Sequence, residues 1–296
     1  MKNTFISPMV FGAWRLADEP SEANTDSVAR KILMSLEHGI STFDHADIYG
    51  NYECEKLFGD AVAKHGISRS KMQFVTKCGI KLVSKNRPEH SLKTYETTRA
   101  HLTKSVETSL KNLRTDVIDL LLIHRPDPLM NPLEVNETFN DLHKQGKVKS
   151  FGVSNFTPSQ VRMLQSKMTL PLISNQIEFS LLNNSAMNNG QLDQCIEMNL
   201  IPMAWSPLAG GRMLTQTDEK TTRIRECLSS LAKKYKVAHP ETIAYAWLLK
   251  HPSKVVPVLG TGKEERLKAA VAAINLPLEH DDWFHLLKAA VGHDVP

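Results

Sequence analysis

The sequence lacks several features that would place it in a membrane or in a secretory pathway. No apolar run reaches about 18 residues, so no transmembrane helix is predicted. The first ten residues, MKNTFISPMV, contain no apolar core of a signal peptide. Four cysteines occur without CxxC spacing, which argues against a disulfide scaffold or a zinc site and favours a reducing compartment. These absences together predict a cytoplasmic protein without a structural metal.

Other absences narrow the class of partner and fold. The net charge of +4 is unclustered, and no basic run with interleaved aromatics indicates nucleic-acid binding. No heptad repeat predicts a coiled coil, which favours a monomer. No GxGxxG run follows a predicted strand, as it would in a doubly wound dinucleotide-binding sheet. With 296 residues, 41% of them hydrophobic, and no linker, the chain is long enough for one large barrel.

What the sequence does contain is a regular alternation of short β-rich runs and helix-period segments. The predicted strands are Met9–Ala13, Ser41–Asp44, Gln73–Thr76, Val117–Ile123, Lys149–Val153, Leu172–Asn175, Ile201–Trp205 and Val255–Leu259. The predicted helices are Thr25–Leu36, Glu53–Lys64, Thr98–Leu113, Leu133–Gln145, one from Pro158, Gln191–Met198, Arg223–Tyr235, Pro240–Leu249, Glu264–Ala273 and Asp281–Ala290.

Eight such units in one chain of this length favour an α/β fold, a single (β/α)8 TIM barrel with a C-terminal extra helix, over residues 1–296. A short β ribbon is expected before the first strand. The polar segment Lys81–Thr94 is long enough to be a functional insertion.

Polar side chains follow most of the predicted strands. Because the carboxyl ends of barrel strands share one face, these residues are expected to converge there. They are Gly12 to Trp14, Asp44 with Tyr49, Lys77, His124, Ser154 with Asn155, Gln176, Trp205 with Ser206, and Gly260 to Lys263.

Asp44, Tyr49, Lys77 and His124 make a chemically interpretable set. An ammonium against a tyrosine hydroxyl stabilises the phenolate and lowers its pKa. A carboxylate at Asp44 would keep Lys77 charged, and His124 would orient a substrate oxygen. This set can protonate a carbonyl oxygen, but no side chain supplies hydride, so a nicotinamide cofactor is implied. Each of these residues alone could have only a structural role. Because all four are expected on one face of the barrel, a catalytic role is favoured.

Eight motifs then match one family in order. They are FGAWRL (11–16), FDHADIYG (43–50), FVTKCG (74–79), SLKNLRTDVIDLLLIHRPD (109–127), KVKSFGVSNF (147–156), SNQIEFS (174–180), AWSPLAGG (204–211) and VPVLGTGKEER (256–266). The chain resembles the aldo-keto reductases, NADP-dependent TIM-barrel oxidoreductases, over nearly its whole length. GTGKEER and the ending VGHDVP resemble a bacterial branch of oxidoreductases with poorly defined substrates.

The resemblance implies a catalytic tetrad of Asp44, Tyr49, Lys77 and His124, with Tyr49 as general acid, and an NADP(H) cofactor. The cofactor-binding residues that it implies are Gly12, Trp14, Ser154, Asn155, Gln176, Trp205, Ser206, Pro207, Leu208, Gly210, Gly260, Thr261, Gly262, Lys263 and Arg266. Trp205 would stack on the nicotinamide, and Lys263 with Arg266 would bind the 2′-phosphate. Trp14 and Tyr52 would line the pocket of a small-molecule carbonyl substrate.

Three departures from the family pattern stand out. His45 replaces the commoner Thr or Ser, and either perturbs the tetrad electrostatics or only packs. Tyr52 and Cys54 replace the usual glycine and serine. Ala269 and Ala270 stand where a Glu-Asn pair often contacts the adenine, which weakens the expected NADP preference.

The leading hypothesis is therefore an NADPH-dependent reductase of aldehydes or ketones. An alternative is an NADP-binding regulatory or sensor protein with vestigial activity. A further alternative uses Lys77 as a Schiff-base lysine, but an adjacent Asp44 opposes the neutral amine that this chemistry needs.

Overall fold

The computed structural model describes residues 6–294. Eight parallel strands form a closed barrel in the order β1-β10-β9-β8-β7-β6-β3-β2, which confirms the predicted (β/α)8 class. These strands are β1 (Val10–Gly12), β2 (Thr42–Asp44), β3 (Gln73–Cys78), β6 (Ile118–Ile123), β7 (Val148–Ser154), β8 (Leu172–Glu178), β9 (Ile201–Trp205) and β10 (Val256–Leu259).

The chain divides into two compact units, residues 1–175 and 176–296. The first unit contains helices α1 (Thr25–Glu37), α2 (Cys54–Lys64), α3 (Arg99–Leu113), α4 (Pro132–Lys144) and α5 (Pro158–Gln165). The second contains α6 (Gln191–Glu197), α7 (Arg212–Thr215), α8 (Glu219–Lys234), α9 (Pro240–Leu249), α10 (Glu264–Ala272) and α11 (His280–Val291). A single domain over residues 1–296 stays a prediction.

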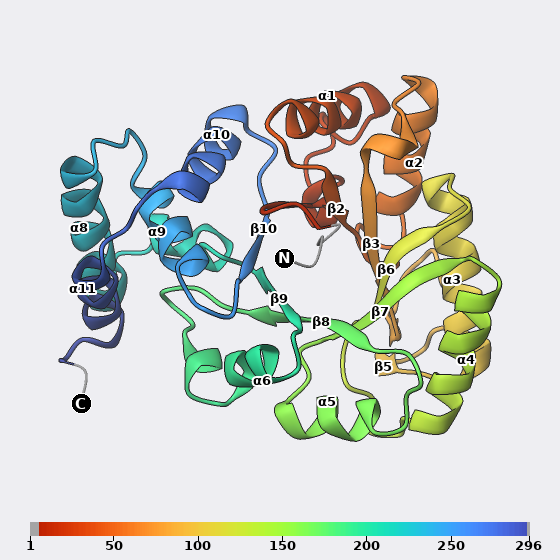
Figure 1. Cartoon of the computed structure of the whole chain (residues 1–296). Coiled ribbons are helices and arrows are strands. Elements are labelled where there is room, and N and C mark those ends of the chain that lie inside the picture. The colour runs from red at the N-terminus through yellow and green to blue at the C-terminus, as the bar shows by residue number, and fades with distance from the viewer. Residues whose placement is uncertain (1–5, 295–296) are drawn as a thin grey trace. The chain divides into compact units, whose positions relative to one another are not determined.

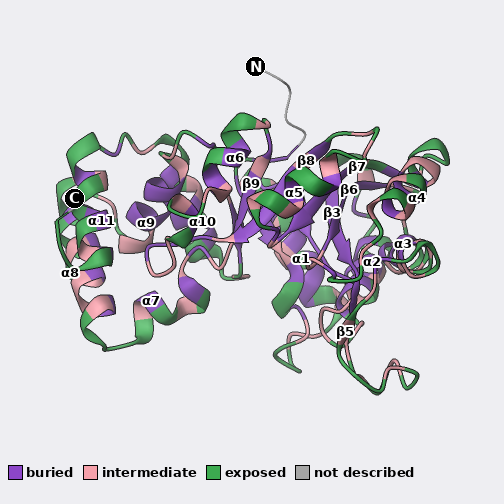
Figure 2. Ribbon diagram, turned by 90° about the horizontal axis from the view of Figure 1, so that it is seen from below, coloured by how far each residue is buried: buried purple, intermediate pink, exposed green. Residues whose placement is uncertain are grey.

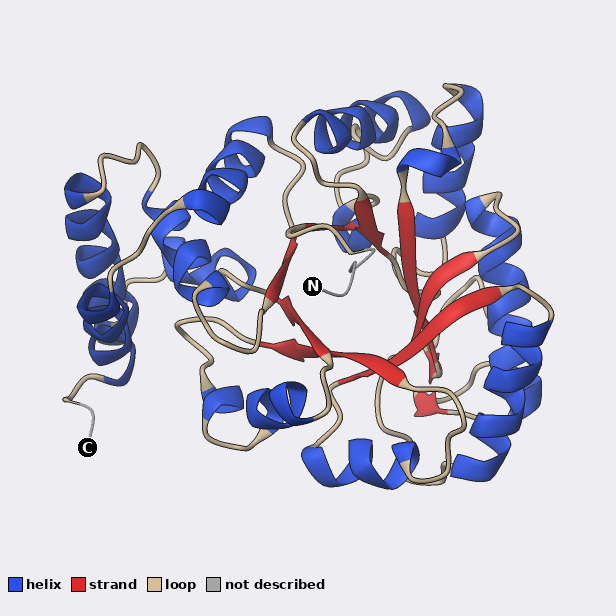
Figure 3. Cartoon of the chain, viewed as in Figure 1, coloured by secondary structure: helices blue, strands red, loops and turns tan. Residues whose placement is uncertain are grey.

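In the first unit the strands form the inner layer and the helices lie along its outer side (Figure 1; Figure 3). The parallel register places Gly12 of β1 opposite Asp44 of β2, and Asp44 opposite Val75 of β3. The carboxyl ends of these strands therefore lie together, and the segments that follow them share one edge.

The core of the first unit is apolar on both sides of its central strands. Every residue of β6 is buried, as expected for a strand covered by a helix layer and by the barrel interior. Phe43 and Phe74 both pack against Phe58 of α2, with ring centroids 5.2 and 5.6 Å apart. Figure 2 shows the same division, with buried strands and helices that are exposed on one side.

Gly59 allows α2 to approach α3 closely. A Cβ atom at this position would lie 2.0 Å from the backbone oxygen of Asn112, closer than any real contact. Any other residue would force the two helices apart, so glycine is required by packing here.

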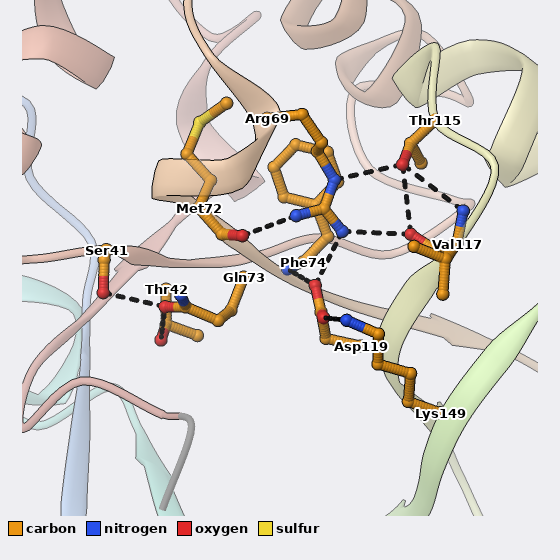
Figure 4. A network of polar contacts seen from close by, with 10 residues as sticks. All are labelled: Ser41, Thr42, Arg69, Met72, Gln73, Phe74, Thr115, Val117, Asp119 and Lys149. Atoms are coloured by element: carbon orange, nitrogen blue, oxygen red, sulfur yellow. Dashed lines mark hydrogen bonds and ion pairs between the residues drawn. The ribbon is translucent and has the colours of Figure 1, made fainter.

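A charged network lies at the amino ends of the same strands (Figure 4). Arg69 Nη2 lies 2.6 Å from Asp119 Oδ2 and donates to the Val117 carbonyl oxygen at 3.0 Å. The same Asp119 oxygen accepts from Phe74 N at 2.8 Å, and Lys149 Nζ lies 2.8 Å from the other oxygen. This network joins β3, β6 and β7 at the end away from the strand termini that carry the predicted site.

In the second unit, α8 packs against both α9 and α11. The indole rings of Trp247 and Trp283 stack with centroids 5.1 Å apart. Each indole N–H donates to the backbone oxygen of the other tryptophan, at 3.2 and 3.0 Å. The reciprocal bonds fix α11 on α9, and they confirm the predicted extra C-terminal helix.

Several elements differ from the expected ones. The expected polar loop is closed by a short antiparallel ribbon, β4 (Ile80–Lys81) with β5 (Thr94–Tyr95). The helix expected from Arg223 begins four residues earlier, at Glu219, because the Asp218 side chain accepts from Thr221 N. The β ribbon expected before the first strand falls partly on residues 1–5, outside the described residues, and residues 6–9 are not in a strand.

Two features are absent from the described part of the chain. No helix within residues 6–294 is long and apolar enough to cross a membrane. In the same range, no group of three or more His, Cys, Asp or Glu side chains is placed to hold a metal ion.

Candidate active site

Lys77 is the centre of the candidate site. Its side chain, at the end of β3, is fully buried. Its ammonium donates to Asp44 Oδ2 at 2.7 Å, to the His45 backbone oxygen at 2.7 Å and to the Tyr49 hydroxyl at 3.0 Å. An ammonium has three donors, so this cation is completely satisfied. The geometry joins three of the four predicted tetrad residues through one nitrogen.

The tetrad charges follow from this arrangement. Burial lowers the pKa of Lys77, but the Asp44 carboxylate and the Tyr49 hydroxyl outweigh it, so the net shift is upward. Lys77 is therefore a cation at neutral pH. Burial raises the pKa of Tyr49 above its ordinary 10.0, and the opposing effect of Lys77 does not overcome it. The expectation of a lowered pKa for Tyr49 is thus wrong in its net direction, because it left out desolvation.

His124 completes the tetrad at the end of β6. Its ring lies edge-on to that of Tyr49, with centroids 6.0 Å apart. Burial lowers the pKa of His124 well below its usual value, and Lys77, Arg125 and Lys93 lower it further. The imidazole is therefore neutral. Within residues 6–294 its Nδ1 is buried and lacks a hydrogen-bond partner.

The contacts of His45 favour the packing interpretation, and both ring nitrogens are buried without a hydrogen-bond partner within residues 6–294. Its ring is fully buried, 4.5 Å from the Phe58 centroid and 6.0 Å from that of Phe74. Burial, followed by Lys77, lowers the pKa of His45 to about 3. The side chain is neutral, and it is the backbone oxygen of this residue that contacts Lys77.

Ser154 and Asn155, predicted to hold the nicotinamide, lie at the end of β7. Asn155 has a φ of 61°, a left-handed conformation that asparagine tolerates better than most residues. Its Nδ2 donates to Ser154 Oγ at 2.8 Å and to the His124 backbone oxygen at 3.4 Å. These contacts place the predicted amide-binding pair beside the tetrad histidine.

The first strand and the segment after Tyr49 carry the other predicted residues of this unit. Gly12 is the last residue of β1, and Trp14 follows it with 56% of its surface exposed. Cys54, at the start of α2, contacts the Trp14 backbone oxygen through its sulfur at 3.9 Å. Tyr52 is half-buried, and its hydroxyl bonds to Leu82 rather than to the tetrad.

In the second unit, Gln176 is a buried residue of β8 and Trp205 ends β9. Ser206 has a φ of 50° and Gly210 a φ of 68°, so the chain turns sharply through Pro207 and Leu208. Gly260, Thr261 and Gly262 lie between β10 and α10, where Thr261 Oγ1 accepts from Lys263 N at 3.2 Å.

Lys263 and Arg266 are exposed at the first turn of α10. Ala269 and Ala270, by contrast, are buried, and the Ala269 backbone oxygen accepts from Thr242 Oγ1 of α9 at 3.0 Å. Their side chains are therefore packing groups in this chain. A larger side chain at either position would not fit without a shift of the neighbouring residues.

Two buried acids near the tetrad were not predicted as part of the site. Glu55 accepts from Thr76, the neighbour of Lys77, at 2.6 Å, and Asp47 N donates to the Lys77 backbone oxygen at 3.0 Å. Burial raises the pKa of Glu55, and burial with the adjacent Glu55 raises that of Asp47 well above its usual value. Their positions could have indicated them, because Asp47 lies inside the FDHADIYG motif and Glu55 follows it by a few residues.

The fold is thus a closed parallel (β/α)8 barrel with a buried Asp-Lys-Tyr cluster and a neutral histidine at its strand ends, where ligands bind in barrels of this class. The model of the aldo/keto reductase family matches residues 8–290. The chain belongs to the aldo/keto reductase family.

Individual relatives agree with this assignment. An uncharacterized oxidoreductase of Bacillus subtilis (strain 168), YcsN, is 47% identical over 98% of this chain and 96% of its own. A 6-dehydroglucose reductase of Agrobacterium fabrum is 41% identical, with the same coverage. The crystal structure of a thermostable aldo-keto reductase, Tm1743, in complex with the inhibitor epalrestat, has a TM-score of 0.82 at 26% identity and covers 97% of both chains.

Proposed function

We propose that this protein is an NADPH-dependent reductase of aldehyde or ketone carbonyls, with Tyr49 as the general acid. The observation that carries the proposal is the buried Lys77 ammonium, shared between the Asp44 carboxylate and the Tyr49 hydroxyl. The relative named 6-dehydroglucose reductase supports the reductive direction.

Each tetrad residue then has one role. Tyr49 is protonated at neutral pH, because burial raises its pKa, and it donates its proton to the carbonyl oxygen. Lys77 stabilises the phenolate that remains, and Asp44 keeps Lys77 charged. His124, as a neutral imidazole, donates an N–H to the same oxygen and orients it. The reduced nicotinamide supplies hydride when it is bound.

The chain offers groups suited to that cofactor. Ser154, Asn155 and Gln176 have the donors and acceptors that a carboxamide needs, and Trp205 can stack on a nicotinamide ring. Lys263 and Arg266 are exposed cations at the start of a helix, a suitable place for a phosphate. These two residues would bind the 2′-phosphate and favour NADPH over NADH.

The two alternative functions, a Schiff-base enzyme and a regulatory NADP-binding protein, make different demands on the site. A Schiff-base lysine must lose its proton, whereas Lys77 has three acceptors and a raised pKa, which disfavours that chemistry. A regulatory NADP-binding protein would keep the cofactor groups without turnover. An intact tetrad favours the enzyme.

The test combines binding with turnover. NADPH and NADH are titrated by fluorescence quenching, and a panel of aldehydes and ketones is followed at the nicotinamide absorbance. We expect tighter binding of NADPH and a loss of turnover of about 100-fold or more in Tyr49→Phe, the lower range for a general acid. Tight binding without turnover on any carbonyl would instead support the regulatory alternative.

A further inference from the structure

Tyr52 fixes the segment 82–93 beside the tetrad. Its hydroxyl accepts from Leu82 N at 2.8 Å and lies 3.3 Å from the Leu82 oxygen and 3.5 Å from His90 Nδ1. The Asn86 side chain donates to the Asn51 oxygen at 2.9 Å. The ribbon β4–β5 closes both ends of the segment. The segment is therefore a largely exposed loop that is anchored at Leu82, Asn86 and His90 and at both of its ends.

Arg87 lies on the face of Tyr52. Its guanidinium carbon is 4.4 Å from the ring centroid, within the range of a cation–π contact. One guanidinium N–H donates to the Asn86 oxygen at 2.7 Å. In the described part of the chain, no carboxylate lies within ion-pair distance of Arg87. The stacking therefore fixes the guanidinium, and most of its N–H donors have no anionic partner.

Arg87 differs from three arginines that form ion pairs, and from Arg212 and Arg225, which bond to backbone or hydroxyl oxygens, in that its guanidinium is held over an aromatic ring beside the strand ends. Arg69, Arg114 and Arg223 each pair with a carboxylate, at 2.6 Å from Asp119, 2.6 Å from Asp60 and 2.7 Å from Glu219. Arginine is well suited to planar, bidentate recognition of oxyanions. Arg87 acts on Glu89 only at longer range than an ion pair, so a guanidinium oriented by the Tyr52 ring keeps donors for an external anion.

The charge around Arg87 strengthens this argument. Residues 81–94 contain four lysines and arginines against one acid, Glu89. Lys81 is paired with Glu96 at 3.0 Å, which leaves Lys85, Arg87 and Lys93 as the cations of this segment without a carboxylate partner in the described chain. Because the segment follows β3, whose carboxyl end carries Lys77, these cations add positive potential near the strand ends, which attracts an anionic substrate.

We propose that Arg87, oriented by Tyr52, binds an oxyanion group of the carbonyl substrate, so that the enzyme prefers aldehydes or ketones bearing a carboxylate or a phosphate. This inference rests on the proposed reductase function. The competing interpretation is that Arg87 only covers the Tyr52 ring.

The test compares matched substrates. Steady-state kcat/KM is measured for 4-carboxybenzaldehyde, its neutral isostere methyl 4-formylbenzoate, and 4-formylphenyl phosphate. We expect the anionic compounds to be preferred, and Arg87→Gln to reduce the carboxylate-to-ester ratio by about 10-fold to 100-fold, mostly through KM, as for the loss of a hydrogen bond to a charged group. Arg87→Lys should keep part of the ratio, because it keeps the charge. Arg30→Gln, the same change on the exposed face of α1, is the matched control.

The relative rates of the two anions show which oxyanion is preferred. A wild-type ratio near one, or an equal loss on both benzaldehydes in Arg87→Gln, would overturn the inference while leaving the reductase function in place. Calorimetric binding of terephthalate gives a readout that needs no turnover. Weaker binding in Arg87→Gln supports the oxyanion site even if no compound is reduced, and equal binding rejects it.

Discussion

The two ends of the strands in the first unit both carry buried charge, but they differ in how completely that charge is paired. At the amino ends, Asp119 is bonded by Arg69, Lys149 and the Phe74 amide (Figure 4). At the carboxyl ends, Lys77 is satisfied, but among the described residues the Tyr49 hydroxyl has only this donor as a hydrogen-bond partner. Within residues 6–294 the hydroxyl proton has no acceptor.

The difference separates a structural cluster from a chemical one. A network in which every donor and acceptor is used stabilises the fold, and it has nothing to offer a ligand. Burial raises the pKa of Asp119, but its three partners lower it by more than burial raises it, so the net shift is downward. At the other end, burial prevails for Tyr49 and keeps the hydroxyl protonated. A buried ion pair alone therefore does not indicate catalysis. A buried hydroxyl whose proton is not donated to another group of the protein does indicate it.

Breaking the carboxyl-end cluster should have the largest effect. Lys77→Met leaves Asp44 buried without its cation, which costs about 3–5 kcal/mol in the free energy of unfolding. Turnover should fall about 100-fold or more. Urea unfolding and steady-state kinetics measure the two effects. Adding Asp44→Asn should restore part of the stability but none of the activity, and an active double variant would contradict the assigned role of Lys77.

Breaking the amino-end cluster should affect stability alone. Asp119→Ala leaves the buried Phe74 N–H without an acceptor and Arg69 without a counter-ion, at a cost of about 2–3 kcal/mol. The cost is smaller than for Lys77, because the Arg69 side chain is 27% exposed. Unfolding by urea checks it. A change in kcat/KM larger than the experimental error, at a temperature where the variant is folded, would mean that the two ends are coupled.

The smallest expected effect is a change in how the stability of the fold depends on pH. Burial raises the pKa of Glu55 above its ordinary 4.5, so above that pH the folded state holds a proton that the unfolded state has lost. Wild-type stability therefore falls as pH rises through this window. Glu55→Gln does not titrate and still accepts from Thr76. Its stability relative to wild type should grow between about pH 5 and about pH 8 in thermal melts. A difference independent of pH would show that Glu55 is ionised in the fold.

Much of the fold was predictable, because the strands of a barrel have strong local signals. β6 is apolar except for Asp119, and the predicted strand Val117–Ile123 differs from the observed one by one residue. α8 was predicted too short, although its Asp218 cap was visible in the sequence. α7, a single turn after Gly211, has no period long enough to detect. The ribbon β4–β5 joins two residues with two, a pairing that only tertiary structure specifies.

The candidate site shows the same limit. Asp44, Tyr49, Lys77 and His124 were predictable because each lies at or shortly after the carboxyl end of a strand of a parallel barrel. The net direction of the Tyr49 pKa was not, since it depends on how much solvent is removed. Arg87 was inside a segment already marked as functional, but its stacking on Tyr52 depends on the folding of that segment.

The contact from Lys77 to the backbone oxygen of residue 45 has a consequence for how this chain could diverge. Every amino acid offers that oxygen, so the identity of residue 45 is separated from the chemistry of the tetrad. The side chain at position 45 is instead limited by the space between Phe58 and Phe74 and by the cost of burying its polar atoms, since both imidazole nitrogens of His45 are buried without a hydrogen-bond partner among the described residues. Substitutions at position 45 should therefore leave the contact with Lys77 in place, whereas substitutions of Asp44 remove a partner of Lys77.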